Sequence, residues 1–237
     1  MPRELIATEP RTLVIREYEE APLGPSQIRI KTEFASPKHG TELVGYRNDP
    51  VANRPYDFAW GANIPRPPEV GVQGFPRPLG NMAVGTVMEI GPEVTRFTVG
   101  DRVFGHFPIR ETQTADETGA DLLPEGISAE AAVCLDPLVM ALAMRDAGIK
   151  LGDRVAIFGL GAIGLFAVQL AKAAGADWVV AVDPLENRRA LAVQFGADAV
   201  LDPFANDGDV GMEIRRLTGP TPDPTPRAQT RITGGYL

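Results

Sequence analysis

Residues 155–183 contain the sequence pattern that most restricts how this chain can fold. An apolar run, VAIF, is followed by the turn GLGAIG, the helix-like run LFAVQLAKAAGA and the apolar run WVVAVD. Strand, glycine-rich turn, helix and strand in this order are typical of dinucleotide-binding folds. In such a unit Gly159 permits the tight turn, Gly161 lets the backbone approach a pyrophosphate, and Gly164 lets the helix pack closely on the strand. The pattern therefore predicts a nucleotide-binding α/β fold.

The residues around this turn indicate which nucleotide it binds. The first helical residues, Ala162 and Ile163, offer free N–H groups and a partial positive charge to the phosphates of a cofactor. Asp183 ends the second strand, where a carboxylate accepts from the ribose hydroxyls of NAD and repels the additional phosphate of NADP. Arg188 is expected beside the adenine or its ribose. We therefore expect NAD. The alternatives are NADP held by Arg188 and Arg189, or a similar domain that binds another nucleotide or none.

The chain on both sides of the turn extends this pattern. A second helix-like run, ENRRALAVQFGA, and a third strand-like run, AVLDP, follow Asp183. The resulting β-α-β-α-β order predicts the first half of a doubly wound parallel sheet. Ahead of the turn, Ser128 is a candidate N-cap for a largely helical stretch that reaches Ala147, with a break before Pro137.

The first part of the chain instead shows the alternating apolar and polar residues that are typical of strands. TLVIREYE and QIRIKTEFAS alternate apolar and polar residues, and AVGTVMEIGPEVTRFTVGDRVFG adds strands separated by glycine-containing turns. We therefore predict a β-rich domain over residues 1–125 and a partial nucleotide-binding domain over residues 126–219. Residues 220–237 are rich in Pro and Thr and poor in apolar residues, and they are predicted to be disordered.

Composition excludes several classes of partner. The formal net charge of −8, without basic runs, argues against nucleic acid and against an anionic membrane surface. The single cysteine, Cys134, excludes internal disulfides and a cysteine-rich zinc lobe, and it is typical of a reducing cytoplasm. The N-terminus MPRELIATEP lacks the apolar core of a signal peptide. Residues 155–171 carry no charge, but their glycines favour a buried strand and helix over a membrane span.

Three phrases carry a resemblance to a known family. They are LGNMAVGTVMEIGPEVTRFTVGDRVFG, LPEGISAEAAV and LGDRVAIFGLGAIGLFAVQLAKAAGADWVVAVD, which follow one another in that order. In this order the chain resembles the medium-chain dehydrogenase/reductase family of the zinc alcohol dehydrogenase type, over residues 1 to about 219. The resemblance implies a GroES-like catalytic domain and a Rossmann domain. It also implies hydride transfer between NAD(H) and a small alcohol or carbonyl substrate, and dimers or tetramers formed through the Rossmann sheet.

The resemblance also assigns roles to residues of the first domain. HGTE falls on the family pattern of a first zinc ligand, a hydroxyl that relays the substrate proton, and an acid beside the metal. His39, Thr41 and Glu42 then take these three places. Asp136 matches the third zinc ligand, with Cys134 as its competitor.

One expected zinc ligand departs from the family pattern. The histidine and glutamate of the family's second ligand motif are replaced here by Asn81 and Met82, neither of which suits zinc. Three readings of His39 stay open: a zinc ligand, a turn residue that lines a polar cleft, or the general acid/base of a zinc-free enzyme. His106, the other histidine, is expected at the surface or at the edge of a cleft.

The number of strands leads to further alternatives. Only about three strands are expected by residue 201, whereas a complete doubly wound domain has six. From this pattern we expect the chain to lack the C-terminal part that family members have. An alternative to an oxidoreductase is a truncated, non-catalytic nucleotide-binding remnant, and another is a zinc-free reductase of enone or quinone type.

Overall fold

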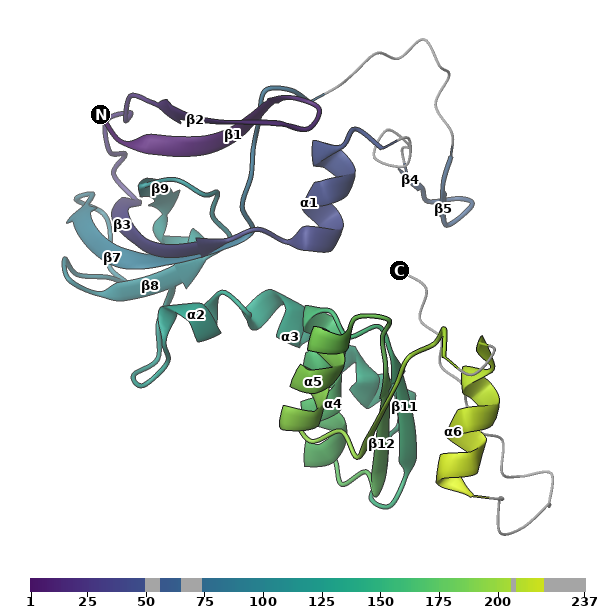
Figure 1. The fold of residues 1–237 in the computed structure, drawn as a ribbon. Helices are drawn as coiled ribbons and strands as arrows, with labels where there is room; N and C mark the ends of the chain where they lie inside the picture. Colours follow the sequence, from purple (N-terminus) through teal and green to yellow (C-terminus); the bar gives the residue numbers. More distant parts are fainter. Residues whose placement is uncertain (50–55, 65–73, 206–207, 220–237) are drawn as a thin grey trace. The chain divides into compact units, whose positions relative to one another are not determined.

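The computed structural model describes residues 1–49, 56–64, 74–205 and 208–219. The chain divides into two compact units, Met1–Cys134 and Leu135–Leu237. Figure 1 traces both units. The predicted boundary at residue 125 stays a prediction, and the predicted disordered tail over residues 220–237 lies outside the described residues.

The first unit is built around an antiparallel five-stranded sheet. Its strand order is β10-β8-β7-β3-β9, and β7 pairs with β3 on one side and β8 on the other. The sequence alternation that predicted these strands places Ile28, Ile30 and Val87 in one buried cluster with Phe97 and Val103. The strands are β3 (Gln27–Ser36), β7 (Met82–Ile90), β8 (Arg102–Gly105), β9 (Thr112–Asp116) and β10 (Asp121–Leu122).

A smaller sheet and several short elements complete the described part of this unit. The smaller sheet has the order β2-β1-β6, in which both pairings are antiparallel. Its strands are β1 (Arg3–Glu9), β2 (Thr12–Glu17) and β6 (Arg77–Pro78). The other elements are helix α1 (His39–Tyr46), strands β4 (Tyr56–Asp57) and β5 (Ala62–Asn63), the 3-10 helix η2 (Glu117–Gly119) and helix α2 (Ala129–Ala132).

The second unit is an α/β layer with a parallel sheet of order β11-β12-β13 (Figure 1). Helices α4 and α5 cover one face of the sheet. Helix α6 is on the opposite side of the sheet in Figure 1. The strands are β11 (Arg154–Phe158), β12 (Trp178–Val182) and β13 (Ala199–Leu201). The helices are α3 (Leu135–Leu142), the 3-10 helix η3 (Ala143–Ala147), α4 (Ala162–Ala173), α5 (Glu186–Gln194) and α6 (Val210–Thr218). This is the predicted β-α-β-α-β order.

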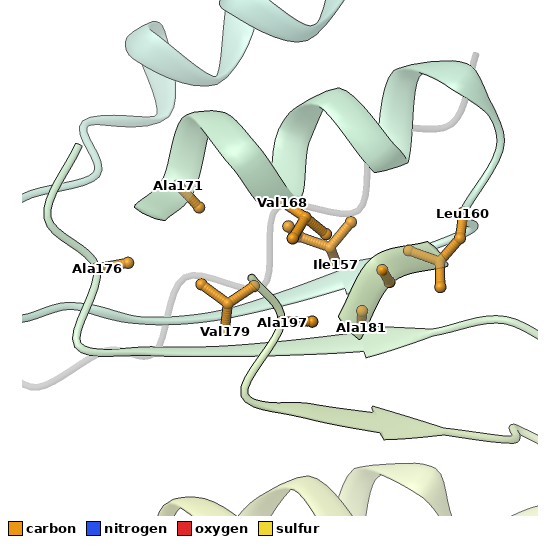
Figure 2. Close-up of a cluster of buried hydrophobic side chains, with 9 residues drawn as sticks. Ile157, Leu160, Val168, Ala171, Ala176, Val179, Ala181 and Ala197 are labelled. Carbon is orange, nitrogen blue, oxygen red and sulfur yellow. The ribbon is translucent and has the colours of Figure 1, made fainter. Parts of the chain in front are cut away.

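The core of the second unit lies between the sheet and the α4–α5 layer (Figure 2). Ile157, Leu160, Val168 and Val179 point toward one another there and are almost fully buried. Burying each such side chain contributes about 1.5–3 kcal/mol. The uncharged run over residues 155–171 is thus a strand and a helix that share this core, as predicted. No helix among the described residues is long and apolar enough to cross a membrane.

Candidate functional site

The glycine turn joins β11 to α4 and leaves open space above its backbone. Gly159 has a φ of +82°, and its N–H donates to the carbonyl of Val182 on β12 (2.8 Å). A Cβ built on Gly159 or on Gly161 would meet no atom within 4 Å. Left-handed backbone favours glycine at position 159, whereas at position 161 the absent side chain leaves room for a ligand. The turn therefore fits the pyrophosphate of a dinucleotide.

The end of α4 that faces this space carries unbonded donors. Gly161 is the N-cap residue, and it provides no side-chain hydrogen bond to the helix. The N–H groups of Ala162 and Ile163 in the first turn thus lack an intrahelical acceptor. With the partial positive charge of a helix of twelve residues behind them, they form an anion-binding end.

Gly164 has the packing role that the sequence pattern predicts. A Cβ at this position would lie 1.9 Å from the carbonyl oxygen of Gly159. Only glycine lets α4 approach the turn this closely, since no side chain fits at that distance. The close approach fixes where the first turn of α4 stands relative to the end of β11.

Asp183 directly follows β12 and lies beside the glycine turn. Its Oδ2 accepts from the N–H of Leu160 (2.8 Å), and its Oδ1 accepts from the N–H of Leu185 (2.8 Å). Burial raises the pKa of this carboxyl, but these two N–H bonds and the Arg188 charge outweigh it and lower the pKa on balance. The buried carboxylate therefore stays ionised and connects the glycine turn to the start of α5.

The two arginines of α5 differ in what they contact. Arg188 places Nη1 3.5 Å from Asp183 Oδ2, and 41% of its side chain is exposed. Arg189 donates to the carbonyl of Asp183 (2.7 Å) and to Asp202 Oδ2 (3.3 Å), and only 18% of its side chain is exposed. Arg189 joins the ends of β12 and β13, which leaves Arg188 as the arginine that faces solvent beside the turn.

The HGTE segment forms the first turn of α1. His39 is the first helical residue, and both His39 and Thr41 are exposed. Glu42 is half-buried, and its two carboxylate oxygens accept from the N–H groups of Lys38 and Gly80. Sequence reasoning missed this anchoring role, because Gly80 is far away in the chain. Glu42 holds the start of α1 against the segment that leads into β7.

Asn81 lies at the end of the five-stranded sheet where α1 begins. Its N–H donates to the carbonyl of Ser36, at the end of β3 (2.9 Å), and its carbonyl is 3.1 Å from Nδ1 of His106. His106 is exposed, as expected, and follows β8 directly. Met82 is buried, so it packs in the core. The ends of β3 and β8 and the start of β7 therefore meet where α1 begins.

The donor set for a zinc ion is incomplete in the described parts of the chain. No group of three or more His, Cys, Asp or Glu side chains is gathered there in a way that could hold a metal. His39 lies in the first unit and Asp136 on α3 in the second. Because Asn81 offers zinc only an amide, the residues present do not fit the three-ligand site that catalytic zinc needs.

Two family models match the chain. Residues 56–144 match the alcohol dehydrogenase GroES-like domain, and residues 162–223 match the zinc-binding dehydrogenase domain. Together they cover the first unit from residue 56 onward and, in the second unit, residues 135–144 and the part that begins with α4.

Known proteins match over nearly the whole chain. A D-guloside 3-dehydrogenase of Escherichia coli K12 is 40% identical over 224 residues, which are 92% of this chain and 63% of that protein. This chain thus spans less than two thirds of its length.

Among solved structures, 2R,3R-butanediol dehydrogenase from Bacillus subtilis has a TM-score of 0.71 at 26% identity. The matched region is 92% of this chain and 68% of that enzyme's chain. A zinc-binding dehydrogenase from Sinorhizobium meliloti 1021 bound to NADP has a TM-score of 0.66 at 26% identity, over 87% and 63% of the two chains. By its two domain models, its relatives and its fold, the chain belongs to the medium-chain dehydrogenase/reductase family of the zinc-type alcohol dehydrogenase kind.

Proposed function

We propose that this chain supplies the catalytic and cofactor-binding residues of an oxidoreductase that transfers a hydride between NAD(H) and a small alcohol or carbonyl. The observation that carries the proposal is the turn at Gly159 and Gly161, with open space above it and unbonded N–H groups at the end of α4. A sugar-like or diol substrate is the best candidate, because a D-guloside 3-dehydrogenase and a butanediol dehydrogenase are among the relatives.

NAD is the proposed cofactor because of the charge on Asp183. A carboxylate with a lowered pKa is ionised at neutral pH, and it repels a second phosphate on the adenosine ribose. A related enzyme of known structure binds NADP. Arg188 is the residue of this chain that could compensate for such a phosphate, since Arg189 is occupied by Asp183 and Asp202.

In the proposed reaction, NAD held at the glycine turn would supply the hydride acceptor for the alcohol carbon. Thr41, exposed at the start of α1, would hold the substrate hydroxyl, and His39, exposed on the same turn, would take up the released proton through water. Glu42 keeps this helix start in place through its two N–H bonds. The alternative role of His39, as a zinc ligand together with Asp136, stays a prediction.

The test is a titration of the purified chain with NADH, followed by fluorescence and calorimetry. Gly161→Asp places a carboxylate at the phosphate end of α4 without a steric clash, and we expect at least a tenfold loss of affinity, about 1.4 kcal/mol. Gly211→Asp, the same substitution on α6, is the matched control and should bind as the parent does. No binding by the parent chain at millimolar NADH would refute the proposal.

Nucleotide binding without turnover is a second candidate. It is favoured by one observation: the residues that fit a nucleotide lie in the second unit, whereas Asn81 of the first unit offers a catalytic metal only an amide. A panel of alcohols with NAD, and of enones and quinones with NADH, separates the candidates. Turnover that His39→Ala abolishes supports the oxidoreductase. Cofactor binding with no turnover on either panel supports the second candidate.

A further inference from the structure

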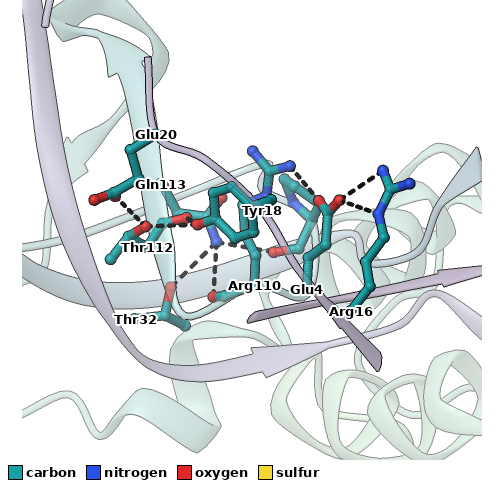
Figure 3. A network of polar contacts seen from close by, with 9 residues as sticks. Glu4, Arg16, Tyr18, Glu20, Thr32, Arg110, Thr112 and Gln113 are labelled. Atoms are coloured by element: carbon teal, nitrogen blue, oxygen red, sulfur yellow. Dashed lines mark hydrogen bonds and ion pairs between the residues drawn. The ribbon is translucent and has the colours of Figure 1, made fainter. Parts of the chain in front are cut away.

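The first β-hairpin buries a carboxylate between two guanidinium groups (Figure 3). Glu4 on β1 has a side chain that is 4% exposed. Its Oε1 accepts from Arg16 Nε (2.9 Å), and Arg16 Nη2 lies 2.8 Å from the same oxygen. Its Oε2 accepts from Arg110 Nη2. Burial raises the pKa of Glu4, but the hydrogen bonds from Arg110 and Arg16 lower it on balance, so the group stays charged.

Arg110 is held in place from its other side as well. Its guanidinium lies over the ring of Tyr18, with the carbon atom Cζ 4.6 Å from the ring centre. The Tyr18 hydroxyl is in turn bonded to the carbonyl (2.9 Å) and the hydroxyl (2.6 Å) of Thr112. Figure 3 shows this chain of contacts running from Glu4 to Thr112. Arg110 therefore keeps a fixed orientation without any bound ligand.

A third arginine completes the wall of a small cavity at this place. The cavity has a volume of about 130 Å³ and is lined by Glu4, Ile6, Arg16, Pro76, Arg77, Pro78 and Arg110. Arg77 packs against α1, because a Cβ built on Gly45 would lie 1.8 Å from its Nη1. The cavity is much smaller than the ~300–1,000 Å³ of most organic-ligand sites, so it suits a single small group.

Two donors of the lining arginines lack acceptors within the described protein. The Nε atoms of Arg77 and Arg110 are buried and have no hydrogen-bond partner among the residues that the structure describes. Buried polar groups are rarely left without partners, and a buried guanidinium donor calls for an acceptor oxygen. Glu4 accepts from Nε of Arg16 and from Nη2 of Arg110. It therefore satisfies neither the Nε of Arg77 nor the Nε of Arg110.

The charges around the cavity favour an anion. Three arginines and one glutamate give a local balance of +3 − 1 = +2, although the chain as a whole carries −8. The planar, fork-like donors of arginine match the oxygens of phosphate. We propose that the cavity lined by Arg16, Arg77 and Arg110 binds one phosphate group, either as inorganic phosphate or as the phosphate of a small monoester. This site is independent of the proposed cofactor turn, which lies in the other unit.

The test is calorimetric titration with inorganic phosphate and, separately, with glucose 6-phosphate. Chloride at equal ionic strength corrects for screening. The titrations use the full chain carrying Gly161→Asp, so that the glycine turn of the second unit does not bind the probe. Saturable binding of inorganic phosphate alone identifies the free ion as the ligand, and tighter binding of glucose 6-phosphate identifies a monoester. The proposal is overturned if neither probe shows saturable binding at a concentration 20-fold above a dissociation constant of roughly 1 mM.

Matched variants locate the binding. Arg77→Gln removes one wall donor without leaving Glu4 unpaired, and we expect it to weaken phosphate binding about tenfold or more. Arg102→Gln removes an exposed arginine of β8 that pairs with Glu33 away from the cavity, and it should bind phosphate as the parent does. Equal binding by Arg77→Gln and the parent overturns the proposal.

A second measurement covers the case in which Arg77→Gln does not fold. In the unmodified chain, the Nε–H signals of Arg77 and Arg110 should shift in ¹⁵N-resolved NMR spectra as phosphate is added, because the anion lies against their guanidinium groups. The Nε–H of Arg102, outside the cavity, should stay in place. If none of the arginine signals moves while phosphate binds, the ion lies elsewhere and the proposal is wrong.

Discussion

At the residue scale, Asp183 serves two backbone amides that belong to different elements. One oxygen accepts from Leu160 in the glycine turn and the other from Leu185 ahead of α5. The strand-ending position of this aspartate is readable from the sequence, because an acidic residue follows an apolar run. Its two amide contacts are not readable, since they depend on how β11 and β12 lie side by side. The carboxylate thus shapes the turn as well as standing where a ribose is expected.

Replacing this carboxylate by an amide is expected to disturb both roles. In Asp183→Asn the side-chain NH₂ faces a backbone N–H, so one buried donor loses its acceptor. We expect a loss of about 1–3 kcal/mol in unfolding free energy and weaker NADH binding. Urea unfolding and NADH titration measure the two effects. Asp177→Asn, at an exposed aspartate before β12, is the control. An unchanged midpoint for Asp183→Asn would contradict the structural role.

Asp116 gives a prediction for acid stability. Bonds from the Ser26 hydroxyl and from the N–H and hydroxyl of Thr118 lower its pKa from 3.8 to about 2. Because the folded pKa is below the unfolded value, the contribution is complete above pH 3.8 and is lost as the pH falls toward 2. Asp116→Asn should flatten the pH dependence of stability in that window. Denaturation at several pH values tests this, and an unchanged slope would rule it out.

Some residue contacts could not be predicted from the sequence at all. Arg189 was a candidate for NADP, but it joins Asp183 to Asp202 because β12 and β13 pair in parallel. Glu42 was assigned to the reaction by resemblance, yet its oxygens hold the N–H groups of Lys38 and Gly80. Both contacts join residues that only the tertiary fold brings together. The glycines of the turn were easier to place, because their roles follow from local backbone geometry.

At the element scale, the helical stretch from residue 128 to Ala147 divides as expected. Ser128 caps α2 by accepting from the N–H of Ala131 (3.2 Å), and α2 ends at Ala132. Helix α3 starts at Leu135, so Pro137 falls in its first turn, where a missing N–H costs nothing. The break precedes the proline, as the sequence predicts. Its consequence was not predictable: the two compact units divide at this same break, between Cys134 and Leu135.

The junction of β11 and α4 offers a matched pair of glycine substitutions. Gly164→Ala puts a methyl group 1.9 Å from the Gly159 carbonyl and should cost about 2–3 kcal/mol of stability. Gly161→Ala meets open space at a negative φ and should keep the parent's stability. Thermal unfolding measures the difference. Both changes should weaken NADH binding, Gly161→Ala because its methyl group occupies the space above the turn. Equal melting temperatures would show that the close approach is not required.

At the scale of the whole molecule, each unit has its own buried core. Val103 belongs to the cluster of the first unit, and Val168 belongs to that of the second. The α/β class and the two kinds of sheet follow from the spacing of apolar residues along the chain. In the first part apolar and polar residues alternate, whereas in the second part short apolar runs alternate with helix-like segments. The order in which strands pair does not follow from this pattern, because β6 pairs with β1 although the two strands are about half of the first unit's sequence apart.

Because each unit has its own core, a cavity made in one core is expected to destabilise mainly the unit that contains it. Val103→Ala and Val168→Ala should each cost about 2 kcal/mol in the unit that contains them. Hydrogen exchange should then quicken mainly in β3, β7 and β8 for Val103→Ala. For Val168→Ala it should quicken in β11, β12 and α4, with weaker NADH binding. Exchange that quickens equally in both units for either variant would contradict the assignment of two cores.

The contact between Gly45 and Arg77 has a consequence for genetic experiments. A methyl group at position 45 would meet the far end of a flexible side chain, so the arginine would shift while the helix stays intact. In a deep mutational scan, Gly45→Ala should therefore leave protein abundance near the parent level. If phosphate binding in this cavity contributes to growth, Gly45→Ala should change fitness when the phosphate concentration of the medium is varied, and it should have no effect on fitness when other nutrients are varied. Position 45 thus lets a library separate ligand response from protein yield.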